Sequence, residues 1–152
     1  MSKSAYRIGE LASEFEMPVE TIRYFEREGL MPAPARSDGN YRLYDGSHRD
    51  RLRFIVHCRS LDMNHVEIRR LLQLRDNPEQ NCKEVNTLLD EHIEHVTKRI
   101  VAMQAMRKQL RAMRAQCSVP GEVDTCGILN ELSLLPVKTA TAAAKTHPKV
   151  AK

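Results

Sequence analysis

The chain has 152 residues, enough for one ordinary domain or for two small units joined by a long helix, and its 41% hydrophobic content suits a globular fold. The formal net charge of +4 comes entirely from Lys138, Lys145, Lys149 and Lys152, so overall charge does not indicate nucleic-acid binding. No apolar run approaches membrane-spanning length and no signal-peptide pattern opens the chain, so we expect a cytoplasmic protein with no membrane partner.

Residues 7–15 and 18–28 predict two short helices separated by a tight turn at Glu16 and Met17. Pro18 suits the first position of the second helix, where its missing N–H is not needed. Gly29 is a natural residue to end that helix. Two short helices joined by a tight turn are a candidate helix-turn-helix, although many helix pairs share this pattern.

Residues 32–44 predict a β-hairpin, because Asp38-Gly39 is flanked by extended, β-favouring residues. Its second half carries Tyr41, Arg42 and Tyr44. A basic, tyrosine-bearing hairpin beside a recognition helix suits the wing of a winged helix, which contacts phosphates. The alternative at this point is a solvated surface loop.

Two more helices follow the hairpin. Ser47 is a candidate cap for the first of them, and Asn64 with Glu67 forms a capping-box pattern for the second. Cys58 lies among apolar residues of the first helix, which is typical of a buried thiol rather than a ligand.

The longest predicted helix begins with a further capping pattern at Asn81 and Glu84 and reaches Cys117 without a proline or glycine. Its start places Cys82 in the first turn, where a helix N-terminus favours the metal-binding thiolate. Apolar or near-apolar positions recur at a mean period of about 3.6, close to a coiled-coil seam. They are Val85, Leu89, His92, Val96, Ile100, Met103, Met106, Leu110 and Met113.

A helix of this length separates Cys82 from Cys117 by about 50 Å. One chain therefore cannot bring these thiols together unless the helix breaks. Two antiparallel copies can, because each end then meets the opposite end of its partner. The pattern predicts a homodimer.

Beyond Cys117, Pro120-Gly121 predicts a loop that reaches Cys126, and residues 127–135 predict a short amphipathic helix that covers the loop. Residues 136–152 have no apolar periodicity, and we expect a disordered tail. In a reducing compartment, cysteines are more often metal ligands, catalytic groups or buried thiols than disulfides.

Several motifs together resemble MerR-type transcriptional activators. In the first half these are residues 8–12 (Ile-Gly-Glu-Leu-Ala), 21–30 (Thr-Ile-Arg-Tyr-Phe-Glu-Arg-Glu-Gly-Leu) and 39–44 (Gly-Asn-Tyr-Arg-Leu-Tyr). Residues 54–63, 67–69, 86–93 and 126–129 are similar to the cadmium- and lead-responsive branch of that family. The resemblance covers residues 6–135.

The resemblance implies a mainly α fold. A winged helix-turn-helix DNA-binding domain would occupy residues 6–75, and an antiparallel coiled-coil dimerisation helix residues 81–117. A metal-binding loop and short helix would occupy residues 117–135, and the tail at 136–152 lies outside the resemblance.

The family also implies a mechanism. Its dimers bind double-stranded promoter DNA, repress without metal, and on binding metal untwist and kink the DNA so that RNA polymerase can use the promoter. The resemblance places Thr21, Arg23 and Tyr24 on the recognition helix. It places Tyr41, Arg42 and Tyr44 on the wing, where they would contact phosphates, while Arg23 would contact a base or base step.

Geometry and resemblance together predict a metal site of Cys82 from one chain with Cys117 and Cys126 from the other. Three thiolates suit a soft divalent cation. Zn(II) and Cd(II) would prefer a fourth ligand, whereas three sulfurs can satisfy Pb(II) or Hg(II). The chain lacks the histidine-rich tail of some cadmium sensors, and Met17 stands where the family has a further cysteine. We therefore expect a response to Pb(II), or to Pb(II) and Cd(II), with Hg(II) or Zn(II) as the alternatives.

Histidines are poor candidates for further ligands at this site. His92 and His95 are near the Cys82 end of the long helix but are assigned to its seam or flank, and His147 is a lone tail histidine. An iron–sulfur regulator of the same family would need four closely spaced cysteines, and a drug-sensing member would need a large domain after the long helix. No Ser/His/Asp or paired-carboxylate set predicts an enzyme. A cytoplasmic metal-buffering protein without DNA binding is the alternative from another class.

Overall fold

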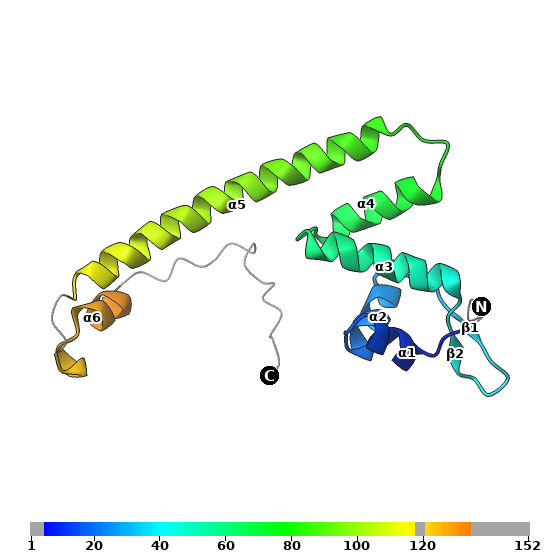
Figure 1. The fold of residues 1–152 in the computed structure, drawn as a ribbon, viewed down its shortest axis with the longest axis horizontal. Coiled ribbons are helices and arrows are strands. Elements are labelled where there is room, and N and C mark those ends of the chain that lie inside the picture. The colour runs from blue at the N-terminus through cyan, green and yellow to red at the C-terminus, as the bar shows by residue number, and fades with distance from the viewer. Residues whose placement is uncertain (1–4, 118–120, 135–152) are drawn as a thin grey trace. The chain divides into compact units, whose positions relative to one another are not determined.

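The computed structural model describes residues 5–117 and 121–134 and is mainly helical, as the sequence predicts (Figure 1). The chain divides into two compact units, Met1–Val96 and Thr97–Lys152. The first unit holds the hydrophobic core, which includes Leu11, Ile22, Phe25, Leu30, Tyr44, Leu52, Ile55, Ile68, Leu72 and Leu88. The predicted disordered tail lies outside the described residues.

The first unit begins with a helix pair, α1 (Ile8–Glu14) and α2 (Val19–Arg27). Leu11 from α1 and Ile22 and Phe25 from α2 are buried between these helices and the rest of the core. Pro18 was predicted to be the first helical residue of α2, but it is the N-cap, and the helix begins one residue later, at Val19. Gly29 follows the helix with a φ of 69°, the left-handed conformation that glycine adopts without steric cost.

The hairpin pairs β1 (Ala35–Arg36) with β2 (Arg42–Leu43) in antiparallel register, Ala35 opposite Leu43. Its connection is longer than the two-residue turn that Asp38-Gly39 favours. The N–H of Asn40 donates to the Ser37 carbonyl at 2.8 Å, and Asn40 itself takes the left-handed conformation with a φ of 61°.

Side-chain caps set the starts of α3 (Gly46–Ser60) and α4 (His65–Asp76). The predicted cap of α3, Ser47, is wrong: Asp45 is the N-cap, and its carboxylate accepts the N–H of His48 at 3.1 Å. The capping box of α4 is confirmed. The Asn64 side chain accepts the N–H of Glu67 at 3.0 Å, and Glu67 Oε2 accepts the N–H of Asn64 at 2.8 Å.

The long helix, α5 (Lys83–Ala115), is continuous. Its first turns pack against the core of the first unit through Val85, Leu88 and His92, whereas Leu89, which the seam pattern favoured, is 38% exposed. The second unit continues with a 3-10 turn, η1 (Val123–Thr125), and α6 (Gly127–Leu134), which falls where a short helix was expected. No helix within the described ranges combines the length and apolarity needed to cross a bilayer.

Candidate nucleic-acid interface and metal centre

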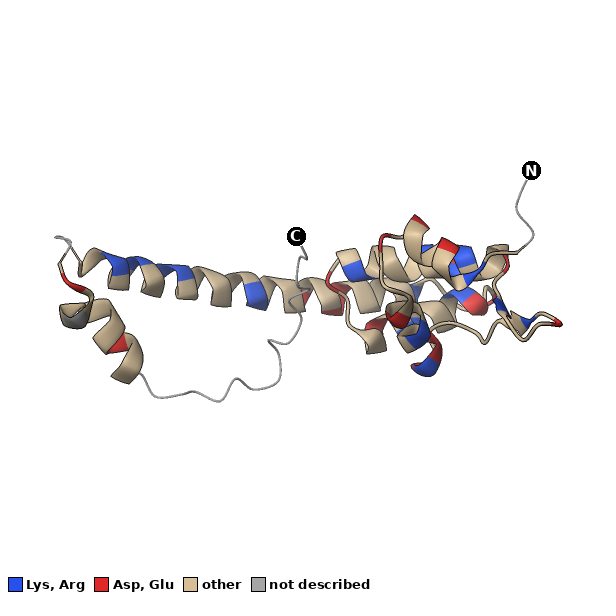
Figure 2. Cartoon of the chain, turned by 90° about the horizontal axis from the view of Figure 1, so that it is seen from below, with Lys and Arg blue, Asp and Glu red and all other residues tan. Residues whose placement is uncertain are grey.

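A shallow concavity in the first unit is formed where the start of α1, the exposed face of α2 and the hairpin converge. Its lining residues are Arg7, Ile8, Gly9, Glu10, Arg23, Asn40, Tyr41 and Arg42. The structure therefore brings together Arg23, Tyr41 and Arg42, three of the six predicted DNA-contacting residues. Figure 2 shows basic residues, all of them Arg, on the hairpin and on the helices beside it.

Local contacts position the basic groups of this concavity. The Arg42 guanidinium lies 3.6 Å from a carboxylate oxygen of Glu26 on α2, which ties the hairpin to the recognition helix. The Arg7 guanidinium carbon lies 5.8 Å from the centre of the Tyr41 ring, within cation–π range. Arg7 was not among the DNA-contacting residues predicted from the sequence. Its place directly before the first helix is the one sequence feature that could have indicated it.

Tyr44 does not belong to this surface, which corrects the expectation that it contacts phosphate. It is fully buried, and its hydroxyl donates to Glu26 Oε1. Burial, reinforced by the neighbouring Glu26 carboxylate, raises the pKa of the Tyr44 phenol. The cause is a backbone bridge between Tyr6 and Tyr44, which draws the end of the hairpin against the body of the unit.

The remaining two recognition-helix residues lie outside the lining of the concavity. Thr21 is half-buried on α2. The Tyr24 hydroxyl lies 3.1 Å from Nδ1 of His65, and the two rings are 5.2 Å apart between centres, so Tyr24 faces the start of α4. Burial, with the nearby Arg59, lowers the pKa of His65.

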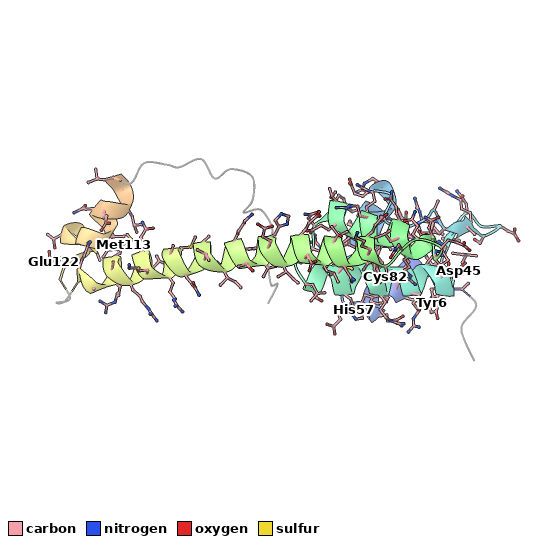
Figure 3. All side chains as sticks on the ribbon, turned by 90° about the horizontal axis from the view of Figure 1, so that it is seen from above. Tyr6, Asp45, His57, Cys82, Met113 and Glu122 are labelled. Atoms are coloured by element: carbon pink, nitrogen blue, oxygen red, sulfur yellow. The ribbon has the colours of Figure 1, made fainter. Side chains whose placement is uncertain are left out.

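The cysteines occupy three different environments, and no disulfide joins them. Cys82 is exposed and directly precedes α5, and its carbonyl accepts the N–H of Asn86. Figure 3 labels Cys82 near the start of the long helix. Cys117 and Cys126 are half-buried and lie after the end of α5 and directly before α6. Cys58 is buried as predicted, and burial raises the pKa of its thiol.

The described part of a single chain does not gather Cys82, Cys117 and Cys126 into one cluster. The group of three metal-ligating side chains that it does bring within reach of one another is Glu67, His92 and His95. His92 and His95 were assigned from the sequence to the helix seam or its flank. Their carboxylate partner is 25 residues before His92, so helical periodicity could not find it.

Known protein families match most of the chain. Residues 6–75 match the model of the MerR HTH family regulatory protein, and residues 49–113 match the model described as MerR, DNA binding. The HTH-type transcriptional regulator ZntR homolog of Haemophilus influenzae is 44% identical over 108 residues, which is 71% of this chain and 80% of that protein. The chain belongs to the MerR family of transcriptional regulators.

Two further relatives of this MerR-family regulator carry a metal in their descriptions. The mercuric resistance operon regulatory protein of Bacillus cereus is 33% identical over 84% of this chain and 96% of its own. The regulator PbrR691 from Ralstonia metallidurans CH34 has a crystal structure in complex with lead(II). Its sequence is 48% identical to this chain, and the two structures align with a TM-score of 0.70. The match covers 83% of this chain and 98% of that one.

These likenesses confirm the predicted family and the mainly α architecture with a helix-turn-helix unit and a long helix. The chain is a MerR-type transcriptional regulator and not an enzyme. The model that matches residues 49–113 describes its family as DNA binding.

Proposed function

We propose that this regulator binds its operator in the cytoplasm as a homodimer and, on binding Pb(II) or Cd(II), distorts promoter DNA to activate heavy-metal resistance genes. Without metal the same dimer represses. RNA polymerase at the same promoter is the partner that responds to the changed DNA. Arg7, Arg23 and Arg42 supply the positive charge that contacts the DNA, with Tyr41 beside them.

The observation that carries this proposal is the continuity of α5 between the predicted ligands. Cys82 directly precedes the helix, and Cys117 lies just beyond its last residue, Ala115. A helix of 33 residues extends for about 50 Å, so the two thiols of one chain cannot share an ion. An antiparallel partner brings its own Cys82 to Cys117 and Cys126, which supports a site made by both chains.

The exposed stripe on the second half of α5 supports the same pairing. Ile100, Met103, Met106 and Leu110 are between 50% and 60% exposed in the single chain and recur at three- and four-residue steps. Four large apolar side chains in a row on one helix face are typical of a helix that packs against another helix.

The donor set favours a soft divalent ion. Three thiolates bind Pb(II), Cd(II) and Hg(II) better than hard cations, and Pb(II) is satisfied by three sulfurs without a fourth ligand. The 48% identity to a regulator that was crystallised with lead(II) supports Pb(II) as the first candidate. Hg(II) is an alternative to Pb(II) and Cd(II), since a mercuric resistance regulator is 33% identical.

The metal must act through the DNA-binding units to change the promoter. Bending or untwisting a DNA site costs about 1–6 kcal/mol, depending on its sequence. The ion can supply this only if it binds the activating arrangement of the dimer more tightly than the repressing one by a comparable free energy. A site that takes ligands from both chains is well suited to this, because its geometry depends on how the chains are arranged.

Transcription in vitro from a promoter that contains the operator, titrated separately with Pb(II), Cd(II), Hg(II) and Zn(II), tests the proposal. We expect activation by Pb(II) at the lowest free concentration. A mixed dimer of Cys82→Ser and Cys117→Ser chains should bind one Pb(II) per dimer, while each variant homodimer binds no Pb(II). Cys58→Ser, in the buried thiol, is the control and should leave activation unchanged.

Two results would contradict the proposal. A mixed dimer with no bound Pb(II) would show that the ligands come from one chain. Metal binding by a protein that does not shift its operator in a gel assay would instead support the metal-buffering alternative.

A further inference from the structure

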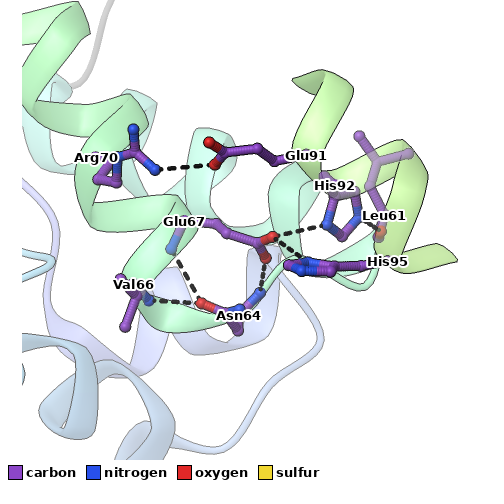
Figure 4. Close-up of polar contacts among 8 residues, drawn as sticks. All are labelled: Leu61, Asn64, Val66, Glu67, Arg70, Glu91, His92 and His95. Carbon is purple, nitrogen blue, oxygen red and sulfur yellow. Dashed lines mark hydrogen bonds and ion pairs between the residues drawn. The ribbon is translucent and has the colours of Figure 1, made fainter. Parts of the chain in front are cut away.

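Glu67, His92 and His95 form a compact group that the three-cysteine site does not use. Glu67 extends from α4, and the two histidines from the first half of α5, all within the first unit (Figure 4). His92 Nδ1 lies 3.0 Å, and His95 Nδ1 3.5 Å, from the same carboxylate oxygen, Glu67 Oε1. The three ligand atoms all lie within 4.8 Å of one another.

These separations match those between ligands of one small metal ion. Nitrogen and oxygen ligands bind Zn(II) at about 2.0–2.1 Å, and at the tetrahedral angle this separates neighbouring ligand atoms by about 3.4 Å. The observed distances of 3.0 and 3.5 Å from Glu67 Oε1 lie on either side of that value.

His92 is held in the orientation that a metal-binding histidine adopts. Its Nε2 lies 2.9 Å from the carbonyl oxygen of Leu61, which can only accept, so Nε2 carries a proton and donates. A histidine that binds metal through one nitrogen commonly donates the other N–H to a backbone carbonyl. Nδ1 of His92 then points at Glu67 Oε1, where either a proton or a cation must lie between them.

The Glu67 carboxylate is also fixed in its orientation by a backbone hydrogen bond. Its other oxygen, Oε2, accepts the backbone N–H of Asn64 at 2.8 Å, which fixes the carboxylate and leaves Oε1 toward the histidines. Glu67 and His92 are 9% and 8% exposed, whereas the His95 side chain is 63% exposed and leaves one side open to solvent.

We propose that Glu67, His92 and His95 form a second metal site, distinct from the three cysteines, that binds a borderline divalent cation such as Zn(II). Two imidazoles and one carboxylate with an open fourth position suit Zn(II) or Co(II), and lack the thiolates that Pb(II) prefers. The ion would join α4 to α5 within the DNA-binding unit. This site does not depend on the proposed three-thiolate site.

The test uses the full-length, tag-free chain with Cys82, Cys117 and Cys126 all replaced by serine. Titration with Co(II), followed by its visible d–d absorption, should show one ion per chain with no sulfur-to-cobalt charge-transfer band, and Zn(II) should displace it. In this background His95→Ala should weaken Co(II) binding at least tenfold. Because His95 is exposed, this change leaves the packing of α5 intact.

His57→Ala is the matched control, because His57 is an exposed histidine on another helix of the same unit and should leave the titration unchanged. Glu67→Gln supplies a second variant, with the same expected loss as His95→Ala. A cysteine-free chain that binds no Co(II), or one whose binding is unaffected by His95→Ala, would show that these groups form only an ion pair and would overturn the proposal. Titration of the wild-type chain with Pb(II), followed by its thiolate absorption, reports on the cysteine site separately.

Discussion

Leu110→Ala on the exposed stripe of α5 is expected to weaken dimerisation by roughly 30- to 300-fold. Leu110 is 58% exposed in the single chain. Fully burying a leucine side chain stabilises by about 1.5–3 kcal/mol, so covering the exposed part contributes roughly 1–1.7 kcal/mol per copy. Each dimer contains two copies, and the loss of about 2–3.5 kcal/mol corresponds to the stated range because each 1.4 kcal/mol is a factor of ten.

Sedimentation equilibrium over a range of protein concentrations measures this dissociation constant. Val101→Ala is the matched control, because Val101 is 61% exposed on the same helix but lies one residue away from Ile100, on a neighbouring face. Circular dichroism should show that both variants keep their helix content. Equal weakening by the two substitutions, or no effect of Leu110→Ala, would refute the assignment of the stripe as the dimer seam.

Three further predictions concern the first unit. Arg42→Gln should weaken binding to all DNA sequences and reduce the slope of log K against log salt by about 1.8 per dimer, for one lost phosphate contact per chain, in fluorescence anisotropy titrations; an unchanged slope would remove Arg42 from the interface. Tyr44→Phe removes the hydrogen bond to Glu26 and should lower the free energy of unfolding by about 1–2 kcal/mol in urea, while the folded protein keeps its operator affinity. Hydrogen bonds from the Ser47 hydroxyl and from the His48 ring and backbone N–H lower the pKa of Asp45. The stability that the ionised Asp45 contributes is therefore present above its unfolded pKa of about 3.9 and is lost as pH falls below that value. Asp45→Asn keeps the cap but should show a smaller loss of stability between pH 5 and pH 3, and a loss equal to that of the wild type would contradict this.

Features that depend on neighbours in the chain were predicted well from the sequence. The capping box of Asn64 and Glu67 and the unbroken α5 follow from residue types at short, fixed spacings, which local hydrogen bonds and sterics control. The cap of α3 was misplaced by two residues, because Asp45 and Ser47 are both good capping residues. Only the backbone path between the hairpin and the helix selects Asp45.

The sequence alone determined the order of the helices, the family, and the separation of Cys82 from Cys117, since an α-helix has a constant rise per residue. Tertiary structure decided which polar side chains reach solvent and which meet each other. Tyr44 follows the exposed Tyr41 and the half-buried Arg42 in the chain, yet it is buried because the hairpin rejoins the body at the Tyr6 bridge. Glu67 and His92 meet because α4 and α5 pack together, and contacts across packed helices leave no fixed spacing in a sequence.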